Sequence, residues 1–184
     1  MRIAFLSILF YASTIILCVS VVAGCGQADP VQKCQNAFLS VDLKSGQQQM
    51  DCFQLKSTVI DGKVSYEYVI NGTLESFTVD YINNQAYLSS GHDLSEEERE
   101  LEFLPIIQHG INANGLSAQK FVSRTLAKDG DSYYYFSEGI GLVYKRSTTW
   151  FASMKLLRLE GRSDQDVEAL IELIHLTEER DCMK

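Results

Sequence analysis

Short runs of β-branched and aromatic residues recur through the middle of this chain, and each run ends at a turn signal. Asp61-Gly62, Asn71-Gly72 and Asn83-Asn84 provide these turns. Asp-Gly and Asn-Gly readily adopt the positive φ that tight hairpin turns require. We therefore predict a meander of antiparallel strands, which covers residues 52–60, 64–70, 74–82 and 86–89.

The pattern changes after residue 93. Ser95 and Glu98 match a capping box, acidic residues follow in the first turn, and Pro105 would end the element. We expect a helix over residues 94–104. The stretch 106–116 contains two glycines and two asparagines, and we interpret it as an irregular connection.

Residues 117–128 fit either a helical face or a strand. We favour a strand, because Asp129-Gly130 separates this segment from the aromatic run 132–136, as in a hairpin. Two more strands are expected at 142–146 and 150–159. A C-terminal helix is predicted at about 164–180, with Ser163 or Asp164 as its N-cap. One apolar face of this helix contains Val167, Leu170, Ile171 and Ile174.

Together these elements predict an α+β fold. Its centre is a strongly curved antiparallel sheet of about eight strands, a meander of hairpins that could form an incomplete barrel. One helix is inserted midway, and a second helix ends the chain.

The N-terminal segment has the features of a secretory signal. Arg2 precedes an uncharged apolar run from Ile3 to Gly24. Val22-Ala23-Gly24-Cys25 resembles the lipobox of bacterial lipoproteins, in which the cysteine is lipidated and becomes the first mature residue. The resemblance implies a signal peptide at 1–24, a lipidated Cys25 with a tether at 25–33, and one globular envelope domain at 34–184. The apolar run is also long enough for an uncleaved anchor, and Cys25 could be an unmodified signal-peptide cysteine.

Lipidation would hold the protein on a membrane. A bacterial lipoprotein cysteine carries a diacylglyceryl group and an N-acyl chain such as palmitate, and several buried chains give stable anchoring where one chain does not. Residue 26 is Gly rather than Asp. By analogy with the lipoprotein family, this implies export to the outer membrane, with the domain facing the periplasm.

The charge of the chain bears on its binding partners, and its cysteines bear on possible disulfides. The net charge of −8 and the absence of a basic stripe argue against nucleic-acid binding. Beyond Cys25 the chain contains Cys34, Cys52 and Cys182, and export would place them in an oxidising compartment. Of the three pairings we favour Cys34–Cys52, although Cys182 could instead join the C-terminal helix to the N-terminal segment.

A second resemblance covers residues 133–159. The run Tyr133-Tyr-Tyr-Phe-Ser-Glu-Gly-Ile-Gly-Leu-Val143, followed by Leu156-Leu-Arg-Leu159, is similar to a hairpin of uncharacterised bacterial envelope proteins. Alternation sends Tyr133 and Tyr135 to one face of the strand and Tyr134 and Phe136 to the other. One set must face the core. An uncovered second set would form a surface for a ligand or partner, with candidate residues Tyr133, Tyr135, Tyr144 and Trp150.

No catalytic motif accompanies these features. His92, Asp93 and His109 lack the spacing of a metal site, so we predict no metal, no cofactor and no enzymatic activity. We expect a non-enzymatic, membrane-anchored binding module for an apolar ligand or protein partner. The alternative is a periplasmic inhibitor or immunity-type protein, whose acidic charge would steer it towards a basic effector enzyme.

Overall fold

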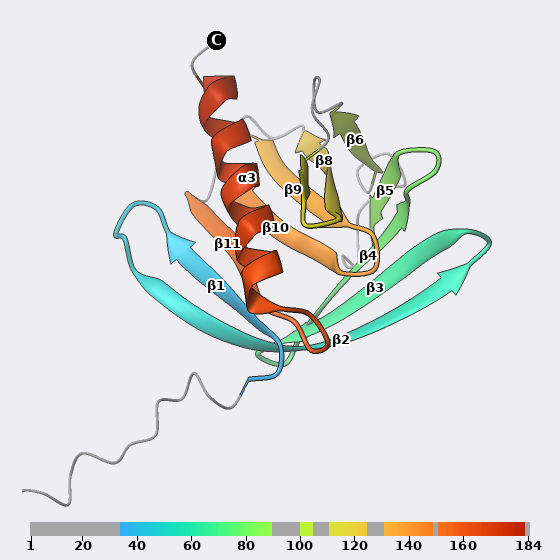
Figure 1. Ribbon diagram of the computed structural model, residues 1–184, viewed down its shortest axis with the longest axis horizontal. Helices are drawn as coiled ribbons and strands as arrows, with labels where there is room; N and C mark the ends of the chain where they lie inside the picture. Colours follow the sequence, from blue (N-terminus) through green and yellow to red (C-terminus); the bar gives the residue numbers. More distant parts are fainter. Residues whose placement is uncertain (1–33, 90–99, 105–110, 125–130, 149–150, 183–184) are drawn as a thin grey trace, which may run out of the picture. The chain divides into compact units, whose positions relative to one another are not determined.

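The computed structural model describes residues 34–89, 100–104, 111–124, 131–148 and 151–182. Strands account for most of this part of the chain, and one long helix follows them (Figure 1). The elements are β1 (Ala37–Asp42), β2 (Gln48–Ile60), β3 (Lys63–Ile70), β4 (Thr73–Asp80), β5 (Gln85–Leu88), β6 (Glu100–Leu104), β7 (Ile111–Ala113), β8 (Leu116–Arg124), β9 (Asp131–Ser137), β10 (Gly141–Ser147), β11 (Ala152–Arg158) and α3 (Asp164–Cys182).

All strand pairs in the described residues are antiparallel, and two pairings close the sheet. The first strand, β1, lies between β2 and the last strand, β11. At the other end of the sheet, β6 pairs with β8. The result is a closed barrel of ten strands, and β7 adds to β8 as a short hairpin partner. Closure removes most of the unpaired edges that an open sheet would expose.

Two-residue turns join β2 to β3 and β3 to β4 as predicted, whereas the connection from β4 to β5 at Asn83-Asn84 is longer and spans residues 81–84. Asp61-Gly62 joins β2 to β3 and Asn71-Gly72 joins β3 to β4, and all four residues have positive φ. A third turn of this kind lies inside the predicted irregular connection, because Asn114-Gly115 joins β7 to β8 with φ values of 50° and 78°. The described part of that connection is therefore a hairpin.

The sequence analysis was wrong about the strand count, the closure and one helix. The described residues form eleven strands instead of about eight, and the barrel is closed instead of incomplete. Residues 100–104, predicted as the end of the inserted helix, form β6. Glu100 and Glu102 are exposed while Leu101 is buried, which is the period-two pattern of a strand. Residues 94–99 lie outside the described residues.

Aromatic side chains fill the barrel. Phe77 of β4 contacts both Tyr134 and Phe136 of β9, with ring centroids 5.8 and 5.2 Å apart. Phe38 stacks on Phe53 at 4.2 Å. These rings occupy the interior face of the strands, so the interior is a packed core and not an open channel.

Helix α3 covers the outer face of β8–β11 and also contacts β7. Its buried face contains Val167, Leu170, Ile171 and Ile174, as the periodicity predicted. The main-chain N–H groups of Asp166 and Val167 donate to the carbonyl oxygen of Ser163, which places the start of the helix at the predicted cap. None of the helices in the described part of the chain is long and apolar enough to cross a bilayer.

Candidate ligand-binding groove

A groove of ≈ 630 Å³ lies between α3 and the outer face of β1, β11 and β10, and we call it the helix-side groove. Its apolar lining comes from Leu39, Val41, Leu43 and Tyr144. Its polar lining consists of Gln48, Arg146, Ser153, Lys155, His175, Glu178 and Glu179.

Strand alternation explains the apolar side of the groove. Phe38 of β1 points into the barrel and is fully buried, so its neighbour Leu39 and, two residues on, Val41 point outwards. Both aliphatic side chains are half-buried. Leu43 follows the strand, and its side chain is 45% exposed. Leu39 and Val41 pair with Lys155 and Ser153 of β11, which brings the two strands to the same groove.

Tyr144 forms the aromatic part of the groove. Its ring lies 5.2 Å from the imidazole of His175 on α3 and 5.7 Å from the ring of Tyr135. Burial raises the pKa of the Tyr144 hydroxyl. Burial, with a smaller contribution from Lys155, lowers the pKa of His175 below its ordinary value of 6.5. Both groups are therefore neutral near pH 7, which suits contact with an apolar molecule.

A buried charged cluster lies at the helix end of the groove. The carboxylate of Glu178 accepts a hydrogen bond from Lys120 Nζ at 2.5 Å and another from the Tyr135 hydroxyl. Arg146 Nη1 lies 3.7 Å from the second carboxylate oxygen of Glu178. The Lys120 ammonium also lies over the Tyr133 ring, 4.8 Å from its centroid. Lys120 thus compensates the charge of Glu178, while the side chain of Arg146 is 36% exposed.

The four aromatic residues predicted to form a binding surface differ in their exposure and surroundings. Tyr135 is fully buried beneath α3, and Tyr133 is half-buried beside Lys120. Tyr144 is only 7% exposed but lines the helix-side groove. Trp150 lies outside the described residues. The helix thus covers the second aromatic face that the sequence analysis considered as an open surface.

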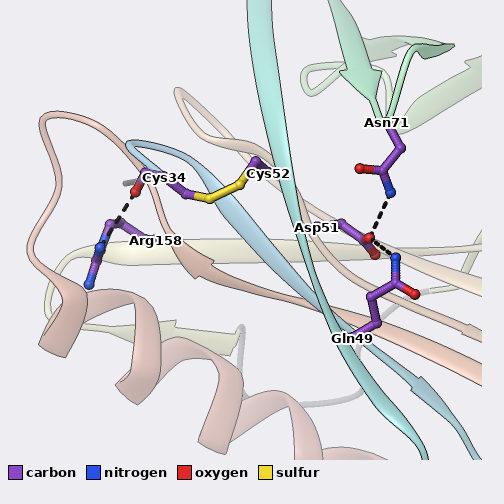
Figure 2. Close-up of a disulfide and its surroundings, with 6 residues drawn as sticks. All are labelled: Cys34, Gln49, Asp51, Cys52, Asn71 and Arg158. Carbon is purple, nitrogen blue, oxygen red and sulfur yellow. Dashed lines mark hydrogen bonds between the residues drawn. A yellow bond between two sulfur atoms is a disulfide. The ribbon is translucent and has the colours of Figure 1, made fainter. Parts of the chain in front are cut away.

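A second hollow of ≈ 620 Å³ is lined by residues of β1, β2, β10 and β11, and we call it the polar mouth. Its lining includes Ser40, Gln49, Lys145 and Ser147. Beside it, buried Asp51 accepts hydrogen bonds from Ser40 Oγ, Gln49 Nε2 and Asn71 Nδ2 at 2.6–2.7 Å. Figure 2 shows Gln49 and Asn71 converging on this carboxylate. The polar side chains of Ser40, Gln49, Asp51 and Asn71 therefore satisfy one another at this end of the barrel.

The cysteine pair lies close to these residues. Cys34, just before β1, is joined by a disulfide to Cys52 of β2, with the Cα atoms 5.6 Å apart (Figure 2). This is the pair favoured from the sequence. The guanidinium of Arg158 on β11 also donates to the carbonyl oxygen of Cys34 at 3.4 Å. The start of the barrel is thus tied to β2 and β11. Cys25, His92, Asp93 and His109 lie outside the described residues.

Sequence reasoning did not find most of the residues that form the groove. Leu39 and Val41 belong to a strand that was not predicted, and Leu43 follows that strand. Their alternation with Phe38 was the available signal. The pairing of Lys120 with Glu178 joins residues 58 positions apart, and no local pattern indicates it.

Comparison with known proteins gave no relative: no protein-family model, no curated protein and no solved structure matches this chain.

Proposed function

We propose that this protein is a lipid-anchored, non-enzymatic binding module of a bacterial cell envelope, and that it binds an apolar ligand in the helix-side groove. The observation that carries the proposal is the row of Leu39, Val41 and Leu43 beside Tyr144, next to a volume of ≈ 630 Å³. Pockets with mainly apolar walls and a few polar groups are typical of small-molecule sites. The exposed side chain of Leu43 would lose contact with water when a ligand binds.

The polar end of the groove would orient the ligand. Arg146 and Lys155 provide positive charge there, Glu178 and Glu179 provide negative charge, and Arg146 lies 3.7 Å from a carboxylate oxygen of Glu178. A ligand with an apolar body and an uncharged polar end would therefore fit. No hydrogen bond joins Ser153 to His175 among the described lining residues, which supports a role in binding instead of catalysis.

The proposed location rests on the N-terminal sequence. The uncharged run from Ile3 to Gly24 and the lipobox-like residues before Cys25 support export and lipidation. The intact mass of membrane-extracted protein tests this directly. We expect a mature chain that begins at Cys25 and carries acyl chains. Cys25→Ser should abolish both the cleavage before residue 25 and the acylation. A native chain that begins at Met1 would contradict lipidation and favour a single-pass anchor.

Ligand binding can be tested on the full chain in membranes with an alkyl diazirine, an apolar probe that labels nearby residues on illumination. Mass spectrometry of peptides should locate the label on β1 and α3. We expect Leu43→Asp to reduce labelling of these peptides by at least about tenfold, since a carboxylate placed in an apolar contact costs several kcal/mol. Leu74→Asp is the matched control, because Leu74 is also exposed but lies on β4 outside the groove.

The outcomes separate the functional hypotheses. Equal labelling of the Leu43→Asp and wild-type proteins would overturn apolar binding in the helix-side groove. The same loss in the Leu74→Asp protein would show that the label reports general surface contact. If no apolar probe labels the groove but the acidic protein inhibits a basic secreted enzyme, the inhibitor hypothesis is favoured instead.

A further inference from the structure

Strand β2 extends well beyond its partner β1. The thirteen residues of β2 pair with β1 only over Gln48–Cys52, while the pairing with β3 continues from Phe53 to Ile60. The last main-chain bond towards β1 joins the N–H of Phe53 to the carbonyl oxygen of Asn36 at 3.1 Å. Residues 54–60 therefore have a neighbouring strand on one side only, within the described residues.

The direction of the free backbone groups follows from that last bond. In an antiparallel ladder, alternate residues direct both main-chain groups to the same side. The main-chain N–H of Phe53 points towards β1. The main-chain N–H and C=O groups of Leu55, Ser57 and Val59 therefore point to the same side, which is open beyond the end of β1. No residue in the described part of the chain pairs with them.

The free edge is accessible. Figure 1 shows the β2–β3 hairpin extending away from β1. Ser57, Thr58, Val59 and Ile60 are all exposed, and the side chains of Val59 and Ile60 are 69% and 62% exposed. Long exposed edges of this kind pair readily with another strand. Residues 54–60 contain no proline, and their single lysine is the only charged side chain that could discourage pairing.

We propose that this edge binds the same edge of a second copy of the chain, antiparallel and centred on Ser57. In this register Ser57 lies opposite the second Ser57, and Leu55 lies opposite Val59. Each of these residues has its main-chain groups on the open side. The two copies can therefore satisfy every free group of Leu55, Ser57 and Val59 at the same time, as an isologous two-fold contact requires.

The side chains also favour a second copy as the partner. Leu55 and Val59 form an apolar cross-strand pair on one face. On the other face Lys56 lies opposite Thr58 and not opposite the second Lys56, so no like charges meet. Lys56 also lies 3.5 Å from Glu67 of its own β3, which compensates its charge. An extended strand from a different protein would have to match this spacing independently.

Disulfide trapping tests both the contact and its register. Lys56 and Thr58 would form a non-hydrogen-bonded cross-strand pair with Cα atoms about 4.5 Å apart, within bridging range. Full-length Lys56→Cys and Thr58→Cys proteins, both carrying Cys182→Ser, should form a heterodisulfide when expressed together. The yield should exceed that of either variant alone by at least about tenfold, because identical positions lie two residues out of register. A Gln54→Cys and Thr58→Cys mixture is also out of register and is the control.

Sedimentation of the detergent-solubilised full chain provides a second measurement. Wild type should contain dimers, Ser57→Pro should be monomeric, and Ser57→Thr should still dimerise. Proline removes an N–H that faces the open side and leaves the β3 ladder intact. A monomeric wild type, equal trapping in the control mixture, or trapping of a different protein at Lys56→Cys would overturn the proposal. In the last case the edge would bind a foreign strand.

Discussion

Lys120 on β8 and Glu178 on α3 form a buried ion pair, with Nζ 2.5 Å from the carboxylate oxygen. Their side chains are only 9% and 10% exposed. The pair joins the helix to the barrel next to the helix-side groove. It therefore contributes both to the packing of α3 and to the charge of the groove.

We predict that Glu178→Leu lowers the free energy of unfolding by about 3–5 kcal/mol, because the buried ammonium of Lys120 would lose its ion pair with the carboxylate of Glu178. Adding Lys120→Met should recover most of this loss, since two apolar side chains need no compensation. Urea denaturation of the single and double variants measures the coupling. If the two losses simply add, the pair is not energetically coupled and the prediction is wrong.

Among the glycines that the structure describes, Gly141 is the one with the least space for a side chain. Its φ is +91°, and an added Cβ would lie 2.1 Å from Tyr68 Oη and 2.9 Å from Tyr66 Cδ1. Tyr68 also accepts a hydrogen bond from the Leu142 N–H at 2.6 Å. Gly141→Ala should therefore destabilise the fold by about 3 kcal/mol or more, from strain and displacement of these rings.

Gly46 is the matched control for Gly141, because its φ is also positive, at +72°, but nothing lies within 4 Å of an added Cβ. Gly46→Ala should cost only about 1–2 kcal/mol, the backbone cost of a left-handed residue. Thermal unfolding of both variants distinguishes the two contributions. Equal losses would show that the contact with Tyr68 has no energetic importance.

The sequence analysis succeeded where a structure is determined by residues close together in the sequence, and it failed where the structure depends on contacts between distant segments. Asp61-Gly62 and Asn71-Gly72 specify hairpins through their own φ values, and the face of α3 follows from its period. The pairing of β1 with β11 joins the two ends of the domain, so no local pattern could reveal the closure. Ser95 and Glu98 resembled a helix start, and the predicted helix extended over Glu100 and Glu102, but pairing with β5 and β8 selected a strand at these two residues.

The groove was harder to predict because it is formed by distant segments. Tyr144 was identified from its aromatic neighbours, but its partner His175 comes from the C-terminal helix. Tyr135 is buried and donates a hydrogen bond to Glu178 of the same helix. The alternation of residues along a strand shows which side chains share a face. Only the tertiary arrangement shows which element covers that face.

The Cys34–Cys52 disulfide should stabilise the domain by about 3 kcal/mol, because it closes a short loop in the unfolded chain. These cysteines are 18 residues apart in sequence. The double variant Cys34→Ser/Cys52→Ser should unfold at a lower urea concentration than wild type. Adding a reductant should lower the wild-type midpoint to that of the variant and leave the variant unchanged. A wild-type midpoint that is insensitive to full reduction would contradict this prediction.

His175 should make stability depend on pH. Burial is the main cause of its lowered pKa, Lys155 and Arg146 lower it further, and Glu178 and Glu179 oppose them. The unfolded chain therefore binds a proton at a higher pH than the native protein does. The free energy of unfolding should fall as the pH decreases through 6.5, the ordinary pKa, and the loss should level off below the native pKa.

Urea denaturation between about pH 7.5 and about pH 5 measures this effect, since histidine is the side chain that ordinarily titrates in that range. His175→Gln should reduce the pH dependence, because glutamine takes up no proton. Leu176→Gln changes the next residue of α3, whose side chain is 50% exposed, and should keep the wild-type slope. If His175→Gln also keeps the full slope, protonation of His175 does not control acid stability, and the carboxylates or the other two histidines, His92 and His109, are its source.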